Sequence, residues 1–110
     1  MDAFYDVFSV DEASTNYRLN VSGFTGNCGD SLEYHNRRVF STMDRDSDAW
    51  LDGNCAEKNK GGFWFRKCAN ANPTGMYQPE GYVNSDALKW YLCYQNYSVK
   101  VYILKFKRNL

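Results

Sequence analysis

Residues 40–77 read FSTMDRDSDAWLDGNCAEKNKGGFWFRKCANANPTGMY, and this stretch decides the fold. Three aspartates alternate near its start, at Asp44, Asp46 and Asp48. Alternating carboxylates gather several hard oxygen ligands in a short loop, and Ca²⁺ takes ligands of this type. A solvated acidic turn explains the same pattern, so the three aspartates alone leave both interpretations open.

An EF-hand is excluded by the residues that follow these aspartates. Such a loop needs a glycine where Ala49 stands and a bidentate glutamate where Cys55 stands. If calcium binds, backbone carbonyls beyond Asp48 must therefore complete its coordination.

The composition suits one small domain with an apolar core. The chain has 110 residues, of which 44% are hydrophobic and 17% aromatic, and this is enough apolar material for a single core. The 13 basic residues balance the 13 acidic residues, which argues against nucleic acid or an anionic membrane as the main partner. The apolar runs are too short to span a bilayer.

Several spaced motifs follow one another in a fixed order along the chain. They read FSVDE, YRL, GFTGNCGDSLEYHN, GNCAE and GGFWF, at residues 8–12, 17–19, 23–36, 53–57 and 61–65. In this order they resemble the fibrinogen-related domains, which are the C-terminal globes of fibrinogen, ficolins, tachylectins and angiopoietins. GGFW and the NPTG sequence at residues 72–75 resemble the branch of the microfibril-associated glycoproteins.

The resemblance covers only the C-terminal half of such a domain, so we expect a partial domain of the α+β class. It implies short antiparallel strands joined to a loop-rich calcium and pocket subdomain. Residues 1–36 would hold the remaining sheet strands and a short helix, residues 37–96 the calcium loop and pocket region, and residues 97–110 the final strand. We expect a fragment or an incomplete gene product whose secretion signal lies upstream.

The hydrophobic pattern predicts few regular elements. The predicted elements are strands at 3–10, 17–21 and 97–106, a turn at 23–29, a short helix at 30–34 and a mostly irregular stretch at 43–72. The first two strands would lack their neighbours from the other half of the family's sheet. Because unpaired apolar strand edges invite aggregation, we predict marginal stability for the isolated chain.

The resemblance assigns the calcium ligands residue by residue. The carboxylates of Asp46 and Asp48 would bind Ca²⁺ together with the backbone oxygens of Trp50 and of a residue near Asp52, and waters would complete the shell. Asp44 would orient the loop through hydrogen bonds. The role of the ion would be structural, because it holds together a long loop whose carboxylates repel one another.

The four cysteines favour disulfides over a zinc site, because the chain has no CxxC spacing and only one histidine. Cys55 and Cys68 match the family's disulfide beside the ligand pocket. Cys28 and Cys93 depart from the family. They could pair with each other, remain as buried thiols or bridge two chains, and of these we favour a second disulfide.

The resemblance also implies a ligand pocket. In lectin-like members an acetyl group sits in an aromatic funnel beside the calcium loop. A cis peptide before Cys68 would aim the N–H groups of Lys67 and Cys68 at the ligand, above Trp64 and Phe65. The other positions assigned to this pocket are Asn59, Ala69 and Tyr82. Plain core packing is the alternative role for Trp64 and Phe65.

The pocket departs from its acetyl-binding relatives. Ala69 replaces the family's histidine after the cysteine, and Asn59 stands where acetyl-binders have tyrosine. The rim is basic, through Lys58, Lys60, Arg66 and Lys67. An acidic sugar or a carboxylate would therefore be preferred over a neutral acetamide.

No nucleophile–base pair is apparent, so we expect no enzymatic activity. Ser31 lies in a GDSL sequence that resembles a hydrolase motif, but the only histidine, His35, is four residues away and forms no independent triad. We expect His35 to be a surface or hydrogen-bonded side chain.

Two functions therefore remain. The first is a secreted, calcium-dependent recognition module of innate-immune type that binds acetylated or acidic glycans. The second, which Ala69 favours, is a protein-binding module of the extracellular matrix or of an angiopoietin-like ligand. The cysteines and the glycosylation sequons at Asn20 and Asn96 fit an extracellular location. We also expect homo-oligomers formed through N-terminal segments absent from this chain, since avidity would raise weak single-site binding.

Overall fold

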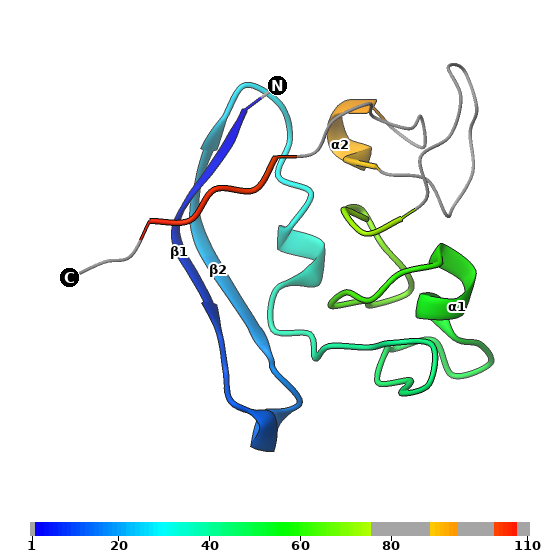
Figure 1. The fold of residues 1–110 in the computed structure, drawn as a ribbon. Coiled ribbons are helices and arrows are strands. Elements are labelled where there is room, and N and C mark those ends of the chain that lie inside the picture. The colour runs from blue at the N-terminus through cyan, green and yellow to red at the C-terminus, as the bar shows by residue number, and fades with distance from the viewer. Residues whose placement is uncertain (1, 76–88, 95–102, 108–110) are drawn as a thin grey trace.

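The computed structural model describes residues 2–75, 89–94 and 103–107. A two-stranded antiparallel sheet lies on one side and a loop-rich region on the other (Figure 1). The elements in chain order are β1 (Ala3–Val10), η1 (Ala13–Thr15), β2 (Leu19–Gly26), η2 (Glu33–His35), α1 (Cys55–Asn59) and α2 (Tyr91–Tyr94). Short antiparallel strands with few helices agree with the predicted α+β class.

β1 and β2 form a hairpin whose register pairs Val10 with Leu19 at the closed end. The strand predicted at 3–10 is confirmed. The second strand starts two residues later than predicted and continues through residues 23–26, where the sequence predicted a turn. Pairing with the start of β1 overrides the turn preference of these residues, because their backbone groups find partners in the ladder.

Gly23 allows β2 to continue past its predicted end. Its φ of +71° is a conformation that glycine adopts at little cost. A Cβ atom at this position would lie only 2.6 Å from the side chain of Asp6 on β1. A larger residue there would therefore push the two strands apart.

The sheet buries only a small part of its apolar surface. Leu19 and Val21 are buried, whereas Phe4 is 63% exposed and Val7 is also exposed. Residues 103–107 cross over the sheet (Figure 1), and the ring of Phe106 lies 5.2 Å from that of Phe8. Among the described residues the sheet therefore consists of two strands with much of their apolar surface open.

The final strand predicted at 97–106 is not found where the structure describes it. Residues 103–107 have no regular secondary structure, and residues 97–102 lie outside the described part. A strand needs a neighbour to complete its hydrogen-bond ladder, and the described sheet pairs β1 only with β2.

The hydrophobic core lies in the loop-rich region. Its buried members are Cys55, Ala56, Phe63, Phe65, Ala71 and Trp90. Two isolated bridges, Ser41 with Phe63 and Ala71 with Trp90, hold the irregular segments around this core. Phe65 therefore takes the core-packing role that the sequence left open.

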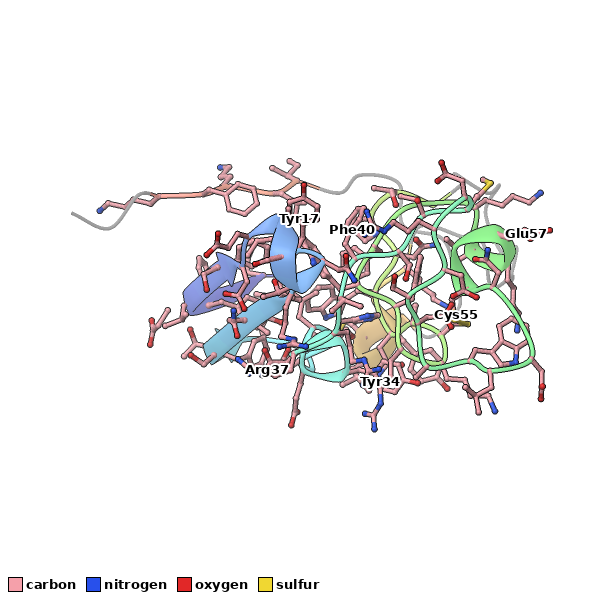
Figure 2. All side chains as sticks on the ribbon, turned by 90° about the horizontal axis from the view of Figure 1, so that it is seen from below. Tyr17, Tyr34, Arg37, Phe40, Cys55 and Glu57 are labelled. Atoms are coloured by element: carbon pink, nitrogen blue, oxygen red, sulfur yellow. A yellow bond between two sulfur atoms is a disulfide. The ribbon has the colours of Figure 1, made fainter. Side chains whose placement is uncertain are left out.

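Trp64 connects the core to the hairpin. Its indole N–H donates to the carbonyl of Tyr17 at 2.7 Å, and its ring meets those of Phe8 and Phe40 edge-on at 6.1 and 5.3 Å. Tyr17 and Phe40 lie between the hairpin and the loops in Figure 2. This aromatic cluster is the main contact between the two regions.

Both pairs of cysteines form disulfides. Cys55 bonds to Cys68 with an S–S distance of 2.09 Å, and Cys28 bonds to Cys93 at 2.10 Å. The first pair closes a short loop inside the core region. The second joins the segment after β2 to α2 across 65 residues, so the disulfide that we favoured for Cys28 and Cys93 is present.

The helices are short, and a side chain caps the first α-helix. α1 starts after Asn54, whose Oδ1 accepts the backbone N–H of Glu57 at 3.1 Å. This helix lies within the stretch 43–72 that was predicted as mostly irregular. The helix predicted at 30–34 is one 3₁₀ turn, η2, and Asp30 caps it by accepting the N–H groups of Leu32 and Glu33 at 3.1 Å each. No helix among the described residues is long and apolar enough to cross a membrane.

Candidate functional site

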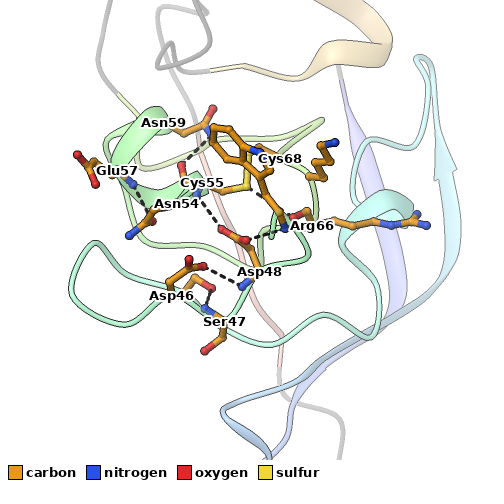
Figure 3. Close-up of a disulfide and its surroundings, with 12 residues drawn as sticks. Asp46, Ser47, Asp48, Asn54, Cys55, Glu57, Asn59, Arg66 and Cys68 are labelled. Carbon is orange, nitrogen blue, oxygen red and sulfur yellow. Dashed lines mark hydrogen bonds between the residues drawn. A yellow bond between two sulfur atoms is a disulfide. The ribbon is translucent and has the colours of Figure 1, made fainter. Parts of the chain in front are cut away.

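Asp48 organises the loop that the sequence assigned to calcium. Its Oδ1 accepts the backbone N–H of Trp50 at 2.8 Å, and its Oδ2 accepts the backbone N–H of Cys55 at 2.7 Å. Asp46 accepts the N–H of Asp48 at 3.3 Å. Figure 3 shows these carboxylates beside the Cys55–Cys68 disulfide. The loop is therefore attached directly to the start of α1.

The other two acidic residues of the loop lie apart from this pair. Asp44 is exposed and accepts the hydroxyl of Thr42 at 2.7 Å, and this bond lowers the pKa of Asp44 below its usual value. Asp52 is exposed. The bond from Thr42 gives Asp44 a role in the shape of the turn, as expected from the sequence.

The donor set at Asp46 and Asp48 fits a hard cation. Burial raises the pKa of Asp48 above its usual value, the N–H bonds from Cys55 and Trp50 oppose this, and the nearby carboxyl group of Asp46 raises it further. A cation between the two carboxylates would relieve this repulsion. Among the described residues no three His, Cys, Asp or Glu side chains come together, so main-chain oxygens such as those of Trp50 and Asp52, and water, would have to supply the remaining ligands.

The peptide between Lys67 and Cys68 is cis, as the resemblance implied. The hydroxyl of Tyr34 donates to the carbonyl of Lys67 at 2.7 Å and accepts the N–H of Lys67 at 3.3 Å. The N–H of Lys67 therefore faces Tyr34, whereas the sequence predicted that it would face a ligand. Cys68 accepts the N–H of Arg66 at 2.9 Å through its carbonyl.

Of the remaining pocket positions, the two that the structure describes are Asn59, which is buried, and Ala69, which is half-buried. Asn59 is only 1% exposed, and its amide donates to the carbonyl of Cys55 at 2.9 Å, so this side chain lies inside the molecule and its contact with a ligand stays a prediction. The cause of this burial is that Asn59 lies on the inner face of α1. Ala69 is half-buried against the core, and Tyr82 lies outside the described residues.

His35 is the most important residue whose role the sequence left unresolved. It is fully buried, and its Nδ1 donates to the carbonyl of Trp64 at 2.7 Å. Its Nε2 accepts the backbone N–H groups of Asn70 and Ala71, each at 3.1 Å. A neutral imidazole satisfies all three bonds. Burial lowers the pKa of His35 to about 4, the bond to Trp64 opposes this, and the charge of Lys89 lowers it further.

Two hollows lie on the surface of the loop-rich region. One has a volume of about 250 Å³ and is lined by Asp30, Glu33, Tyr34, Arg66, Asn70 and Leu92. The other has a volume of about 430 Å³ and is lined by Trp50, Asn54, Glu57, Lys58 and Lys60. The sequence had placed Lys58 and Lys60 on a basic rim, but it gave no sign that Trp50 would join them.

The side chain of Asn20, in the first predicted glycosylation sequon, already has two hydrogen-bond partners. The amide nitrogen of Asn20 donates to Asp11 at 3.0 Å, and its oxygen accepts from Arg37 at 2.6 Å. A glycan on this nitrogen would replace one of its two hydrogens and leave a single N–H donor, so glycosylation at Asn20 stays a prediction. Asn96 lies outside the described residues.

The comparisons with known proteins agree with this architecture. The model of the C-terminal globular domain of fibrinogen beta and gamma chains matches residues 1–109. The chain belongs to this family. It is 45% identical to tenascin of Gallus gallus over 89 residues, which cover 81% of this chain and 5% of that protein.

Two solved structures of the family are similar to this chain. The fibrinogen-like globe domain of human ANGPTL6 is 40% identical with a TM-score of 0.80, and the match covers 87% of this chain and 45% of that one. Lamprey fibrin D-dimer, complexed with the peptide Gly-His-Arg-Pro-amide, is 25% identical with a TM-score of 0.77 over 89% of this chain and 38% of that one. The chain thus spans less than half the length of these globes.

Proposed function

We propose that this chain is the recognition part of an extracellular fibrinogen-like module that binds a protein partner. Its relatives, the tenascins and angiopoietin-related proteins, are secreted extracellular proteins. We choose between the two predicted functions on the burial of Asn59. Because this side chain belongs to α1 and is buried, we assign it no part in an acetyl funnel, and we assign recognition to the exposed rim of the loops.

Calcium is part of this proposal. Asp46 and Asp48 would hold the ion with the backbone oxygens of Trp50 and of a residue near Asp52. The ion would supply positive charge between two carboxylates and so fix the loop before a partner arrives, which reduces the entropy lost on binding. Calorimetry of Asp46→Ala tests these ligands: we expect Ca²⁺ uptake to disappear, and unchanged uptake would remove them.

An acidic glycan is the second candidate ligand. The exposed basic side chains of Lys58, Lys60, Arg66 and Lys67 favour it. We propose no catalytic role for the chain. Oligomerisation through segments outside these 110 residues would strengthen either kind of binding by avidity.

One experiment separates the two candidates. The chain is applied, with calcium and with EDTA, to an array of extracellular proteins and to an array of acetylated and acidic glycans. We expect calcium-dependent signals on the protein array and none on acetylated sugars, with circular dichroism showing that the fold is retained. Strong calcium-dependent signals on acetylated sugars alone would overturn the proposal.

A further inference from the structure

The hollow beside α1 combines an aromatic side chain with two basic side chains. Trp50, Lys58 and Lys60 line it together with Asn54 and Glu57. The ammonium group of Lys58 lies 5.3 Å from the centre of the Trp50 ring, within the range of a cation–π contact. The hollow has a volume of about 430 Å³, which leaves room for a side chain of another molecule.

Most of the polar groups of this hollow are suited to an anion. Lys58 and Lys60 contribute positive charge, and the indole N–H of Trp50 is a further hydrogen-bond donor of the lining. Both polar atoms of the Asn54 side chain already have hydrogen-bond partners, because its Nδ2 donates to the carbonyl of Met43 at 3.0 Å and its Oδ1 caps α1. Glu57 is the one carboxylate of the lining and is exposed.

A further lysine makes the surroundings more positive. Lys89 is almost fully buried. Burial lowers the pKa of Lys89, and the charge of Lys58 lowers it further. A carboxylate bound at Lys58 would offset this unfavourable interaction between the two positive charges.

Trp50 is held in place before any ligand arrives. The indole ring packs against the backbone of Gly53, where a Cβ atom would lie 2.4 Å from the ring. The backbone N–H of Trp50 donates to Asp48 at 2.8 Å, which attaches the hollow to the candidate calcium loop. A fixed aromatic side chain of this kind is a common anchor in protein interfaces.

The neighbouring residue favours a peptide over a saccharide. Leu51 is 97% exposed although it is apolar, and it follows Trp50 directly in the chain. An apolar side chain of a protein partner would cover Leu51, whereas a highly charged saccharide has little apolar surface to offer.

We propose that this hollow is the subsite for an acidic side chain of the protein partner, within a segment that places an apolar residue next to that side chain. Lys58 and Lys60 bind the carboxylate, Trp50 donates its indole N–H, and Leu51 contacts the apolar neighbour. The inference rests on the proposed protein-binding function and specifies the chemistry of the partner.

The direct test uses an acetylated peptide of alternating glutamate and leucine, titrated calorimetrically into the full chain with calcium present. A peptide with glutamine in place of glutamate and a heparin-derived oligosaccharide are measured alongside. We expect the glutamate peptide to bind and the other two to bind much more weakly. Binding of the oligosaccharide alone, or of no ligand, overturns the proposal.

Variants locate the binding in this hollow. Lys58→Ala with Lys60→Ala should weaken binding of the glutamate peptide about tenfold. Trp50→Phe removes the indole N–H donor, so the NMR chemical-shift changes that the peptide causes at the residues of the hollow should differ from those in the wild-type chain. Lys105→Ala with Lys107→Ala removes an equal charge from exposed positions elsewhere and should have no effect. Lys58→Arg with Lys60→Arg keeps the charge and should retain binding, which controls for damage to the fold.

The protein array distinguishes failure of this inference from failure of the proposed function. If the double alanine variant keeps its calcium-dependent array signals, the hollow is not the subsite but the module still binds proteins. If the wild-type chain gives no protein signals at all, the proposed function itself fails.

Discussion

The hairpin and the loop-rich region are stabilised in different ways. β1 and β2 pair along most of their length, with one gap at Asp6 and Gly23, but they leave Phe4 and Val7 exposed. The loop region has little regular structure, yet it contains the core, the Cys55–Cys68 disulfide and a fully buried His35. Regular secondary structure is therefore a poor guide to where this chain is most stable.

Removing the Cys28–Cys93 disulfide should have the largest effect on this comparison. It closes a loop with a sequence separation of 65 residues, and the chain-entropy model gives about 4 kcal/mol for such a loop. Replacing both cysteines by alanine should lower the free energy of unfolding by about that amount and shift the urea midpoint to a lower concentration. Urea unfolding followed by circular dichroism measures it.

The matched control is alanine at Cys55 and Cys68. That pair has a separation of 13 residues, for which the same model gives about 3 kcal/mol. If loss of the Cys28–Cys93 disulfide lowers the free energy of unfolding less than loss of the Cys55–Cys68 disulfide, loop entropy does not determine the contribution of these cross-links.

Acid should destabilise the loop region next most strongly. The pKa of His35 is about 4 in the folded chain, below its unfolded value of about 6.5. Between these values the unfolded chain binds more protons, so stability is complete above about pH 6.5 and falls as the pH drops toward 4. The loss reaches roughly 3 kcal/mol.

Unfolding curves between pH 7 and pH 4 measure this loss. His35→Gln cannot gain the proton, so its stability, lower at pH 7, should depend much less on pH in this window. Equal pH slopes in the two proteins would show that His35 is not responsible.

Asp48→Asn should give an intermediate effect. An asparagine has one acceptor oxygen, whereas Asp48 accepts from Trp50 with one oxygen and from Cys55 with the other. One buried N–H would lose its partner, at a cost of about 1–3 kcal/mol. Calcium should then no longer raise the melting temperature. Asp44→Asn is the control, because Asp44 is exposed, and it should keep the response to calcium.

Phe4→Thr should give the smallest change in stability. Phe4 is 63% exposed, and threonine is a good strand residue, so the free energy of unfolding should change by less than about 0.5 kcal/mol. The same variant should reduce self-association, which sedimentation velocity measures. A large loss of stability would mean that the hairpin depends on this side chain after all.

The sequence was informative wherever a pattern is local or carried by a motif. Alternation predicted β1, and the family motifs predicted the Cys55–Cys68 pair and the cis peptide before Cys68. The extension of β2 through residues 23–26 was missed because cross-strand pairing outweighs the turn preference of two glycines. The motifs also identified the family from about half of a globe.

The details of the candidate site depend on tertiary packing and could not be predicted. No local pattern indicates that α1 turns Asn59 inward, or that the imidazole of His35 meets Trp64, Asn70 and Ala71. The same holds for the side chain of Trp50, because the sequence gave a role only to the backbone carbonyl of this residue, as a calcium ligand. Its side chain meets Lys58 because α1 folds back along the loop that begins at Asp46.

The position of the tryptophans gives the chain a built-in optical probe. Trp50, Trp64 and Trp90 all lie outside β1 and β2, so intrinsic fluorescence reports mainly on the loop-rich region. Trp64 donates to the carbonyl of Tyr17 at the hairpin connection. A red shift of its emission would mark the separation of the hairpin from the rest of the molecule, even while the surroundings of the other two indoles stay unchanged.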